Sequence, residues 1–453
     1  MLKEEKLKWI QNYLYNTKMN MDIQYPFLLD DKKVNEIISY VNGLDKNIDD
    51  IKKIVDDILQ KIKQEGEILK QFKSMIEENI SFKKIKQPNM DLYMVNANPL
   101  QGFNFPYLLY VPQKTNIVST ICIDNKTPVS SKDEFDKTII RTFEEDLEMS
   151  RIPRTILSEM NEPVFIPVLP RFHGFYTTAL GSMIRNNDQS YLLENISNHE
   201  ISLDEKDLSK LENIPEQYHQ MILHAQNFIR NQLGLKVNSK VIQTGYSAAS
   251  KLASNYTELY PETVEALIVG GTTGLDIRPT KKYNYPLGVK DIPNYDELSS
   301  KQVSRFIYIG REDENDPALC KCVLDDRQDV NGNIVPKLNE NGNIMPIKDE
   351  NGKYVSYYKD TYTDEEVNTI FTEFGQNKEE RLENYREITQ KLGYDVTIKM
   401  YEGNHKTVQR NYEVIQDVMT FLKLKTISKK DAWNRLEELI NQSNELEYQG
   451  RVR

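Results

Sequence analysis

Ser247, at a predicted sharp turn, is the residue in this sequence best placed to act as a nucleophile. It lies in the segment GYSAA at 245–249, after an apolar, β-branched run at 240–244 and at the start of helix-forming residues 248–260. A second apolar run follows at 264–269. This order predicts strand, turn, helix and strand, with the serine hydroxyl turned outward beside the positive end of the helix dipole. A nucleophile of acyl transfer needs such a position.

A serine hydroxyl becomes a strong nucleophile only when a base removes its proton, so the five histidines are the next candidates. In a parallel sheet, catalytic groups come from loops at the carboxyl ends of strands. His405 follows the predicted strand 395–401 and meets this condition. His173 follows the strand 164–169 near the same edge, so it competes with His405, and a substrate contact is another role for it. The others lie in a polar loop or inside a predicted helix: His199, His219 and His224.

The third group, which orients the base, is expected after another strand. The apolar run 304–309 leads into GREDENDP, in which Asp313 is the favoured acid. Glu312 and Asp316 are close enough to compete for the role. The alternative interpretation of these carboxylates is an acidic surface turn. The chain order of the candidates is Ser247, Asp313 and His405.

Several motifs resemble α/β-hydrolases, most closely the branch with esterases, polyhydroxybutyrate depolymerases and feruloyl esterases. Residues 106–112 resemble the opening strand of that branch, 240–260 its nucleophile unit, 309–313 its acid segment and 403–405 its Gly-x-His. The resemblance covers about 105–424. It implies an α/β fold, a mostly parallel sheet with helices on both faces. It also implies Ser247 as nucleophile, Asp313 as acid and His405 as base.

The loop after the predicted strand 116–123 departs from that family. The family has His-Gly where this chain has Asp124 and Asn125. We therefore expect the oxyanion donors to be the Ala248 N–H and the side-chain amide of Asn125. Lys126 and Tyr246 are further candidates for substrate binding. Ala249 also stands where the G-x-S-x-G motif around the nucleophile has its second glycine.

Residues outside this region divide the chain further. Residues 1–95 are predicted to be helical, 96–428 to form the hydrolase domain and 429–453 to be a C-terminal helix or tail. The first part contains a heptad seam, which favours either a coiled-coil homodimer or a helix packed within its own chain. The seam consists of Ile48, Ile51, Val55, Ile58, Ile62, Glu65, Leu69, Phe72 and Ile76.

An insert at about 323–360 interrupts the alternation of strands and helices. Asn-Gly recurs at 331, 341 and 351, and this pair suits type I′ hairpin turns. We expect a β-hairpin insert that decorates the surface, covers the site or forms a dimer arm. Its spacing does not match a calcium-binding loop.

Composition narrows the function classes. The net charge of −11 argues against a nucleic-acid partner. The apolar runs are too short for a membrane span, and the charged start of the chain does not resemble a secretory signal. The cysteines, among them Cys320 and Cys322, form neither a disulfide framework nor a zinc motif. We expect no cofactor or metal, and a cytoplasmic location.

The sequence therefore predicts a serine hydrolase that cleaves a carboxylic ester, with a small-molecule or acyl-ester substrate. Two alternatives stay open. One is a binding or assembly module that has kept the hydrolase fold with weak catalysis. The other is an acyltransferase that uses the same three residues.

Overall fold

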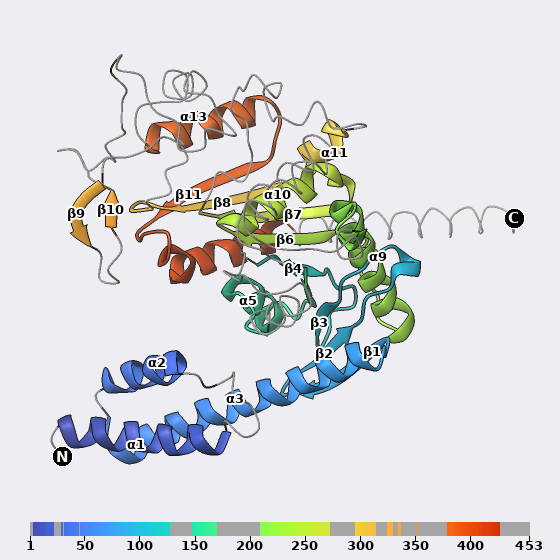
Figure 1. Ribbon diagram of the computed structural model, residues 1–453. Coiled ribbons are helices and arrows are strands. Elements are labelled where there is room, and N and C mark those ends of the chain that lie inside the picture. The colour runs from blue at the N-terminus through green and yellow to red at the C-terminus, as the bar shows by residue number, and fades with distance from the viewer. Residues whose placement is uncertain are drawn as a thin grey trace, which may run out of the picture.

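A nine-stranded sheet forms the centre of the molecule in the computed structural model (Figure 1). The strand order is β1-β2-β3-β5-β4-β6-β7-β8-β11. The structure describes residues 3–21, 31–44, 46–126, 147–169, 209–271, 295–313, 324–328, 334–336 and 378–425, with the single residues 29 and 350.

The strands from β5 to β11 are parallel, whereas β1, β2 and β3 are added at one edge as antiparallel neighbours. Strands buried on both faces need apolar residues throughout, and β3, β5, β7 and β8 are buried along their whole length. The bounds are β1 (Phe82–Gln87), β2 (Met90–Val95), β3 (Tyr107–Pro112), β4 (Cys122–Asp124), β5 (Val164–Pro167), β6 (Val241–Tyr246), β7 (Val264–Gly270), β8 (Ser304–Gly310) and β11 (Val396–Tyr401).

Helices cover both faces of the sheet. One core cluster joins the sheet to α9 (Ile214–Gln232), α10 (Ala248–Leu259) and α13 (Lys378–Lys391). The other joins it to α5 (Arg151–Glu159), the second half of α3 (Ile48–Glu77) and the helical residues 412–425. Alternate residues of a strand enter opposite clusters, as Leu108 and Leu109 do in β3. The predicted fold class, an α/β architecture with a mostly parallel sheet and helices on both faces, is confirmed.

The N-terminal helices form a small bundle of their own (Figure 1). α1 (Lys3–Met21) and α2 (Asp31–Asn42) bury apolar side chains against the first half of α3. The second half of α3 instead packs on the sheet through residues that include Leu69 and Phe72. Much of the heptad seam is therefore buried inside the chain, as the bundle interpretation expects. A homodimer through these helices stays a prediction.

Residues 82–95 correct the prediction that the whole of 1–95 is helical, because they form the antiparallel pair β1 and β2. Asn79, just after α3, has a positive φ of 51°. Pro88 and Asn89 then make the turn between the strands, and the φ of Asn89 is 66°. Asparagine tolerates this left-handed conformation, so two asparagines mark the change from helix to hairpin.

One more segment differs from the predicted elements. Only residues 122 and 123 of the predicted strand 116–123 belong to the sheet, as part of β4; Ser119 instead bonds to Lys236 in the loop before β6. In the insert, β9 (Leu324–Gln328) and β10 (Ile334–Pro336) form a separate antiparallel pair. The three Asn-Gly pairs and the tail 429–453 lie outside the described residues.

Candidate active site

Ser247 occupies a strained turn between β6 and α10. Its φ and ψ are 55° and −121°, a conformation that L-residues rarely adopt and that typically costs about 1–3 kcal/mol. The Ser247 N–H donates to the carbonyl oxygen of Gly270 at 2.8 Å, which fixes the turn against β7. A Cβ on Gly245 would lie 2.4 Å from the Ala249 carbonyl oxygen, so the turn needs glycine there. Such a turn holds the serine hydroxyl away from the sheet edge.

The loop that carries His405 is built by short-range hydrogen bonds. The Asn404 side-chain oxygen accepts from the backbone N–H groups of Lys406 and Thr407 at 3.0 and 3.1 Å. A Cβ on Gly310 would lie 2.2 Å from the Gly403 carbonyl oxygen, so glycine lets the ends of β8 and β11 approach closely. This approach brings the loops after the two strands together.

Three side chains meet at this edge of the sheet. The Oγ of Ser247 lies 2.8 Å from Nε2 of His405. The Nδ1 of His405 lies 2.9 and 3.0 Å from the two carboxyl oxygens of Asp313. A carboxylate can only accept hydrogen bonds, so the imidazole proton lies on Nδ1, facing Asp313. Nε2 is then free to accept a hydrogen bond from the serine hydroxyl. This tautomer can take a proton from Ser247.

The surroundings distinguish the three candidate acids. Asp313 is fully buried, whereas the neighbouring Glu312 is exposed. The side chain of His405 is 15% exposed, between the buried carboxyl group and the serine. Asp316 lies outside the described residues. Of the two described carboxylates, only Asp313 has a hydrogen bond to a histidine.

The other described histidines are used elsewhere. Nδ1 of His219 lies 3.0 Å from the Tyr256 hydroxyl, and its ring stacks on Tyr260. Nδ1 of His224 lies 2.7 Å from the Tyr107 hydroxyl. Burial lowers the pKa of both imidazoles, which favours their neutral form. His173 and His199 lie outside the described residues.

Tyr246, predicted as a substrate contact, instead contacts the candidate base. Its hydroxyl donates to the backbone carbonyl of His405, and its ring lies 5.1 Å from the imidazole ring, centre to centre. On its other side the ring stacks at 5.8 Å on Tyr308. Burial, and then the charge of Asp124, raise the pKa of Tyr308 far above its ordinary value, so this ring stays neutral. Tyr246 thus connects the β6 turn with the His405 loop.

We expect Tyr246→Phe to lower kcat for ester hydrolysis about fivefold with little change in KM, because one hydrogen bond of about 1 kcal/mol that positions His405 is lost. Steady-state kinetics with a chromogenic ester measures both constants. The control is Tyr412→Phe, which changes an exposed tyrosine. A rise in KM alone would instead favour the substrate-binding role.

Asn125 and Lys126 have partners inside the protein. The Asn125 amide nitrogen donates to Gln243 Oε1 at 2.9 Å and to the Thr244 carbonyl at 2.8 Å. Its oxygen accepts from the Tyr218 hydroxyl at 2.8 Å. The Lys126 ammonium lies 3.1 Å from the buried Asp124 carboxylate. These contacts do not favour the predicted oxyanion role of the Asn125 side chain, or a free cation at Lys126 for substrate binding.

The remaining site prediction, the Ala248 N–H, concerns the surroundings of the serine. Ala248 is the first residue of α10, so its N–H is one of the helix N–H groups without an intrahelical partner. Gly271, directly after β7, is not among the predicted site residues. A Cβ there would lie 2.8 Å from Cε1 of His405, so this turn borders the imidazole.

Tyr218 and Tyr308 were missed by sequence reasoning. Both are buried in the core yet contact site elements, Tyr218 through Asn125 and Tyr308 through Tyr246. Their positions in an amphipathic helix and an apolar strand look like ordinary core positions, and no signal in the sequence separates them. In the described part of the chain, no cluster of three or more His, Cys, Asp or Glu side chains is arranged to hold a metal, and no helix is long and apolar enough to cross a membrane.

Comparison with known proteins gives structural neighbours only. No family model and no curated protein sequence matches the chain. A cold-adapted esterase from an Arctic intertidal metagenomic library is 10% identical, with a TM-score of 0.32 over 76% of this chain and 97% of that one. An S-formylglutathione hydrolase from Agrobacterium tumefaciens is 10% identical, with a TM-score of 0.36 over 76% and 99%.

A third neighbour is the siderophore hydrolase EstB from Aspergillus nidulans, 13% identical with a TM-score of 0.34 over 74% of this chain and 95% of that one. Esterases are thus found among these structural neighbours.

Proposed function

We propose that this chain is a serine hydrolase that cleaves a carboxylic ester through an acyl-enzyme. The observation that carries the proposal is the continuous hydrogen-bonded series from the Ser247 hydroxyl through both nitrogens of His405 to the buried Asp313. The strained Ser247 backbone supports it, because strain of this kind is concentrated at functional sites.

In the first step, Nε2 of His405 takes the hydroxyl proton while Ser247 Oγ attacks the ester carbonyl carbon. Asp313 holds the imidazole in its tautomer and balances the charge of the imidazolium. The tetrahedral intermediate then collapses, and His405 returns the proton to the leaving alkoxide. In the second step, His405 takes a proton from water while the water oxygen attacks the acyl-enzyme carbonyl. The second tetrahedral intermediate then collapses as His405 returns this proton to Ser247 Oγ, which releases the acid and restores the free serine.

The oxyanion of both steps needs hydrogen-bond donors. Ala248 N–H is the first donor by its place at the start of α10. The second donor is not Asn125: its side-chain amide bonds to Gln243 and Thr244, and its backbone N–H also donates to the Thr244 carbonyl at 3.3 Å. In this arrangement the contacts of Asn125 hold the loop after β4 against β6, and the side chain itself does not touch the substrate.

A burst experiment tests the two-step mechanism. Mixing the protein with excess p-nitrophenyl acetate should release a rapid burst of p-nitrophenol, equal to the concentration of active chains, before steady turnover. Intact mass spectrometry of the quenched mixture should then find an acetyl group on Ser247. Turnover without acetylation of Ser247 would contradict the proposal.

The same experiment separates the alternatives. An acyltransferase would give the acetylated serine with slow turnover that accelerates when an alcohol or amine acceptor is added. A binding module would give neither acetylation nor turnover in folded protein. A hydrolase and an acyltransferase would use the same three residues and the same contacts. The kinetics must therefore show whether water or another acceptor takes the acyl group from Ser247.

A further inference from the structure

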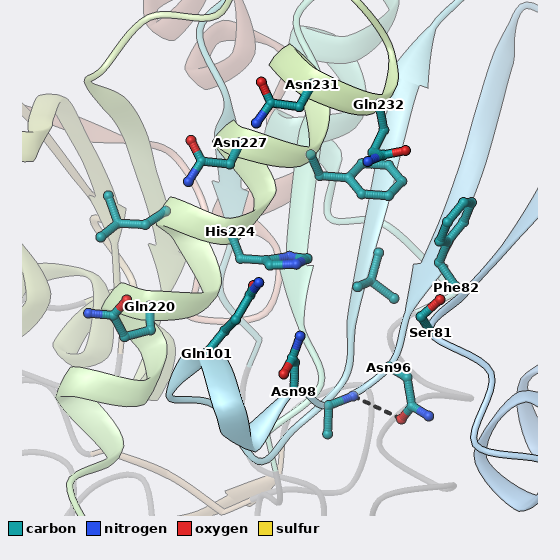
Figure 2. A pocket seen from close by; sticks show the side chains of 14 residues that line it. Ser81, Phe82, Asn96, Asn98, Gln101, Gln220, His224, Asn227, Asn231 and Gln232 are labelled. Atoms are coloured by element: carbon teal, nitrogen blue, oxygen red, sulfur yellow. Dashed lines mark hydrogen bonds between the residues drawn. The ribbon is translucent and has the colours of Figure 1, made fainter.

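A groove with a cavity volume of about 640 Å³ lies between the β1–β2 edge of the sheet and α9 (Figure 2). Its volume is in the usual range of ligand sites, which is about 300–1,000 Å³. β1 is five strands from β6 in the sheet, so the groove lies on the order of 24 Å from the Ser247 turn. It is therefore a feature separate from the candidate active site.

One wall of the groove is a stripe of uncharged polar side chains on α9. Gln220, His224, Asn227 and Asn231 follow each other at spacings of four, three and four, which places them on one helix face. Gln232 extends the stripe at its end. The side chains of Asn231 and Gln232 make no hydrogen bond within the described part of the chain.

The opposite wall comes from β2 and the short turn after it, η1 (Pro99–Gln101). Asn98 and Gln101 contribute further amides, and among the described residues their side chains also form no hydrogen bond. Figure 2 shows these two amides and the His224 ring converging from the two walls. Each amide offers both donors and an acceptor.

His224 presents a hydrogen-bond donor to this space. The buried Tyr107 hydroxyl lies 2.7 Å from its Nδ1 and has no other partner among the described residues. The hydroxyl therefore donates to Nδ1, which leaves the proton of the neutral imidazole on Nε2. Burial raises the pKa of Tyr107 and lowers that of His224, so both groups stay neutral near pH 7.

The lining favours an uncharged ligand. About 28% of the residues of the chain are charged, yet none of the described residues that line the groove is Lys, Arg, Asp or Glu. Two neighbouring charged side chains are bonded to lining amides: Arg230 donates to Asn227 Oδ1 at 3.3 Å, and Glu216 accepts from the Gln220 amide at 2.7 Å. A phosphate or carboxylate ligand would need a basic group, and a metal cation would need acidic oxygens. The floor is instead apolar: Phe82, which is 40% exposed, packs edge-on against the buried Phe228 at 5.2 Å.

We propose that this groove binds a neutral oligosaccharide. A sugar ring has an apolar C–H face, which fits the partly exposed Phe82 ring, and a rim of hydroxyl groups that both donate and accept. The amides of the two walls match that rim, because each donates and accepts as well. This site does not depend on the proposed esterase chemistry, because it shares no residue with the Ser247 turn.

Isothermal titration calorimetry with maltohexaose, cellohexaose and xylohexaose tests the proposal on the full chain. We expect at least one of these neutral probes to bind with a Kd between micromolar and millimolar. The double variant Gln101→Ala, Asn227→Ala should weaken that binding about tenfold or more, because amides on both walls are lost. Both residues are exposed, so the fold should persist.

The matched control is Gln60→Ala, which removes an exposed amide from α3 outside the groove and should leave Kd unchanged. Hydrolysis of p-nitrophenyl acetate should be equal in all variants, which keeps this test separate from that of the active site. The proposal is overturned if no oligosaccharide probe binds at a concentration of about 10 mM, tenfold above the weakest expected Kd. It is also overturned if the double variant binds as tightly as the unchanged protein, or if only uncharged peptides bind.

Discussion

Ser247→Ala is expected to lower kcat for ester hydrolysis by roughly 10⁴-fold or more, the largest effect in this account. The residues of such a relay act as a unit, so loss of the nucleophile removes the covalent route completely. Any remaining rate comes from binding and the oxyanion donors. Initial rates with p-nitrophenyl acetate, corrected for spontaneous hydrolysis, measure this change.

Ser158→Ala is the matched control for the serine variant. Ser158 is an exposed serine of α5, and its only side-chain hydrogen bond among the described residues is one of 3.3 Å from its hydroxyl to a backbone carbonyl one turn earlier. Its replacement should leave the rate unchanged. A Ser247→Ala protein that keeps half of its activity would mean that another group performs the chemistry.

Asp313→Asn is expected to give the second large effect, a fall in kcat on the order of 10⁴-fold. An amide in this buried position can donate to Nδ1 through its nitrogen, which would place the imidazole proton on Nε2. The base would then face Ser247 with a donor and could not accept the hydroxyl proton. The change is nearly isosteric, so circular dichroism should find the same fold.

Glu312→Gln provides the control for the acid, because the same chemical change is made one residue away on an exposed side chain. Its kcat should stay within about twofold of the unchanged protein, as surface substitutions away from special features have small effects. An equal fall of kcat in Asp313→Asn and Glu312→Gln would mean that the loss of negative charge near this edge of the sheet causes the effect, and not the loss of the contact with His405.

The positions of the three candidate residues could be predicted because each follows an apolar strand that the sequence makes recognisable. Parallel strands end at one edge, so Ser247, Asp313 and His405 had to approach one another once β6, β8 and β11 were recognised. The sequence alone does not separate Asp313 from Glu312, since burial of one and exposure of the other depend on the close approach of Gly310 and Gly403.

The contacts behind the site could not be predicted in the same way. A sequence gives the residue type of Asn125 but not the partners Gln243 and Tyr218, which come from a different strand and a helix. The β1–β2 pair lies in the region predicted to be helical, because the two apolar residues of β1 (FKKIKQ) are three positions apart, a spacing typical of a helix. Tertiary contacts that join distant segments decide both cases.

Labelling with a fluorophosphonate probe, followed by peptide mass spectrometry, tests the central claim most directly. Phosphonylation requires a serine whose proton can be taken by a neighbouring base. We expect rapid labelling at Ser247 in the unchanged protein, and labelling lost or strongly slowed in His405→Ala. A folded protein that stays unlabelled, or one labelled equally fast without His405, would contradict the assignment of Ser247 as an activated nucleophile.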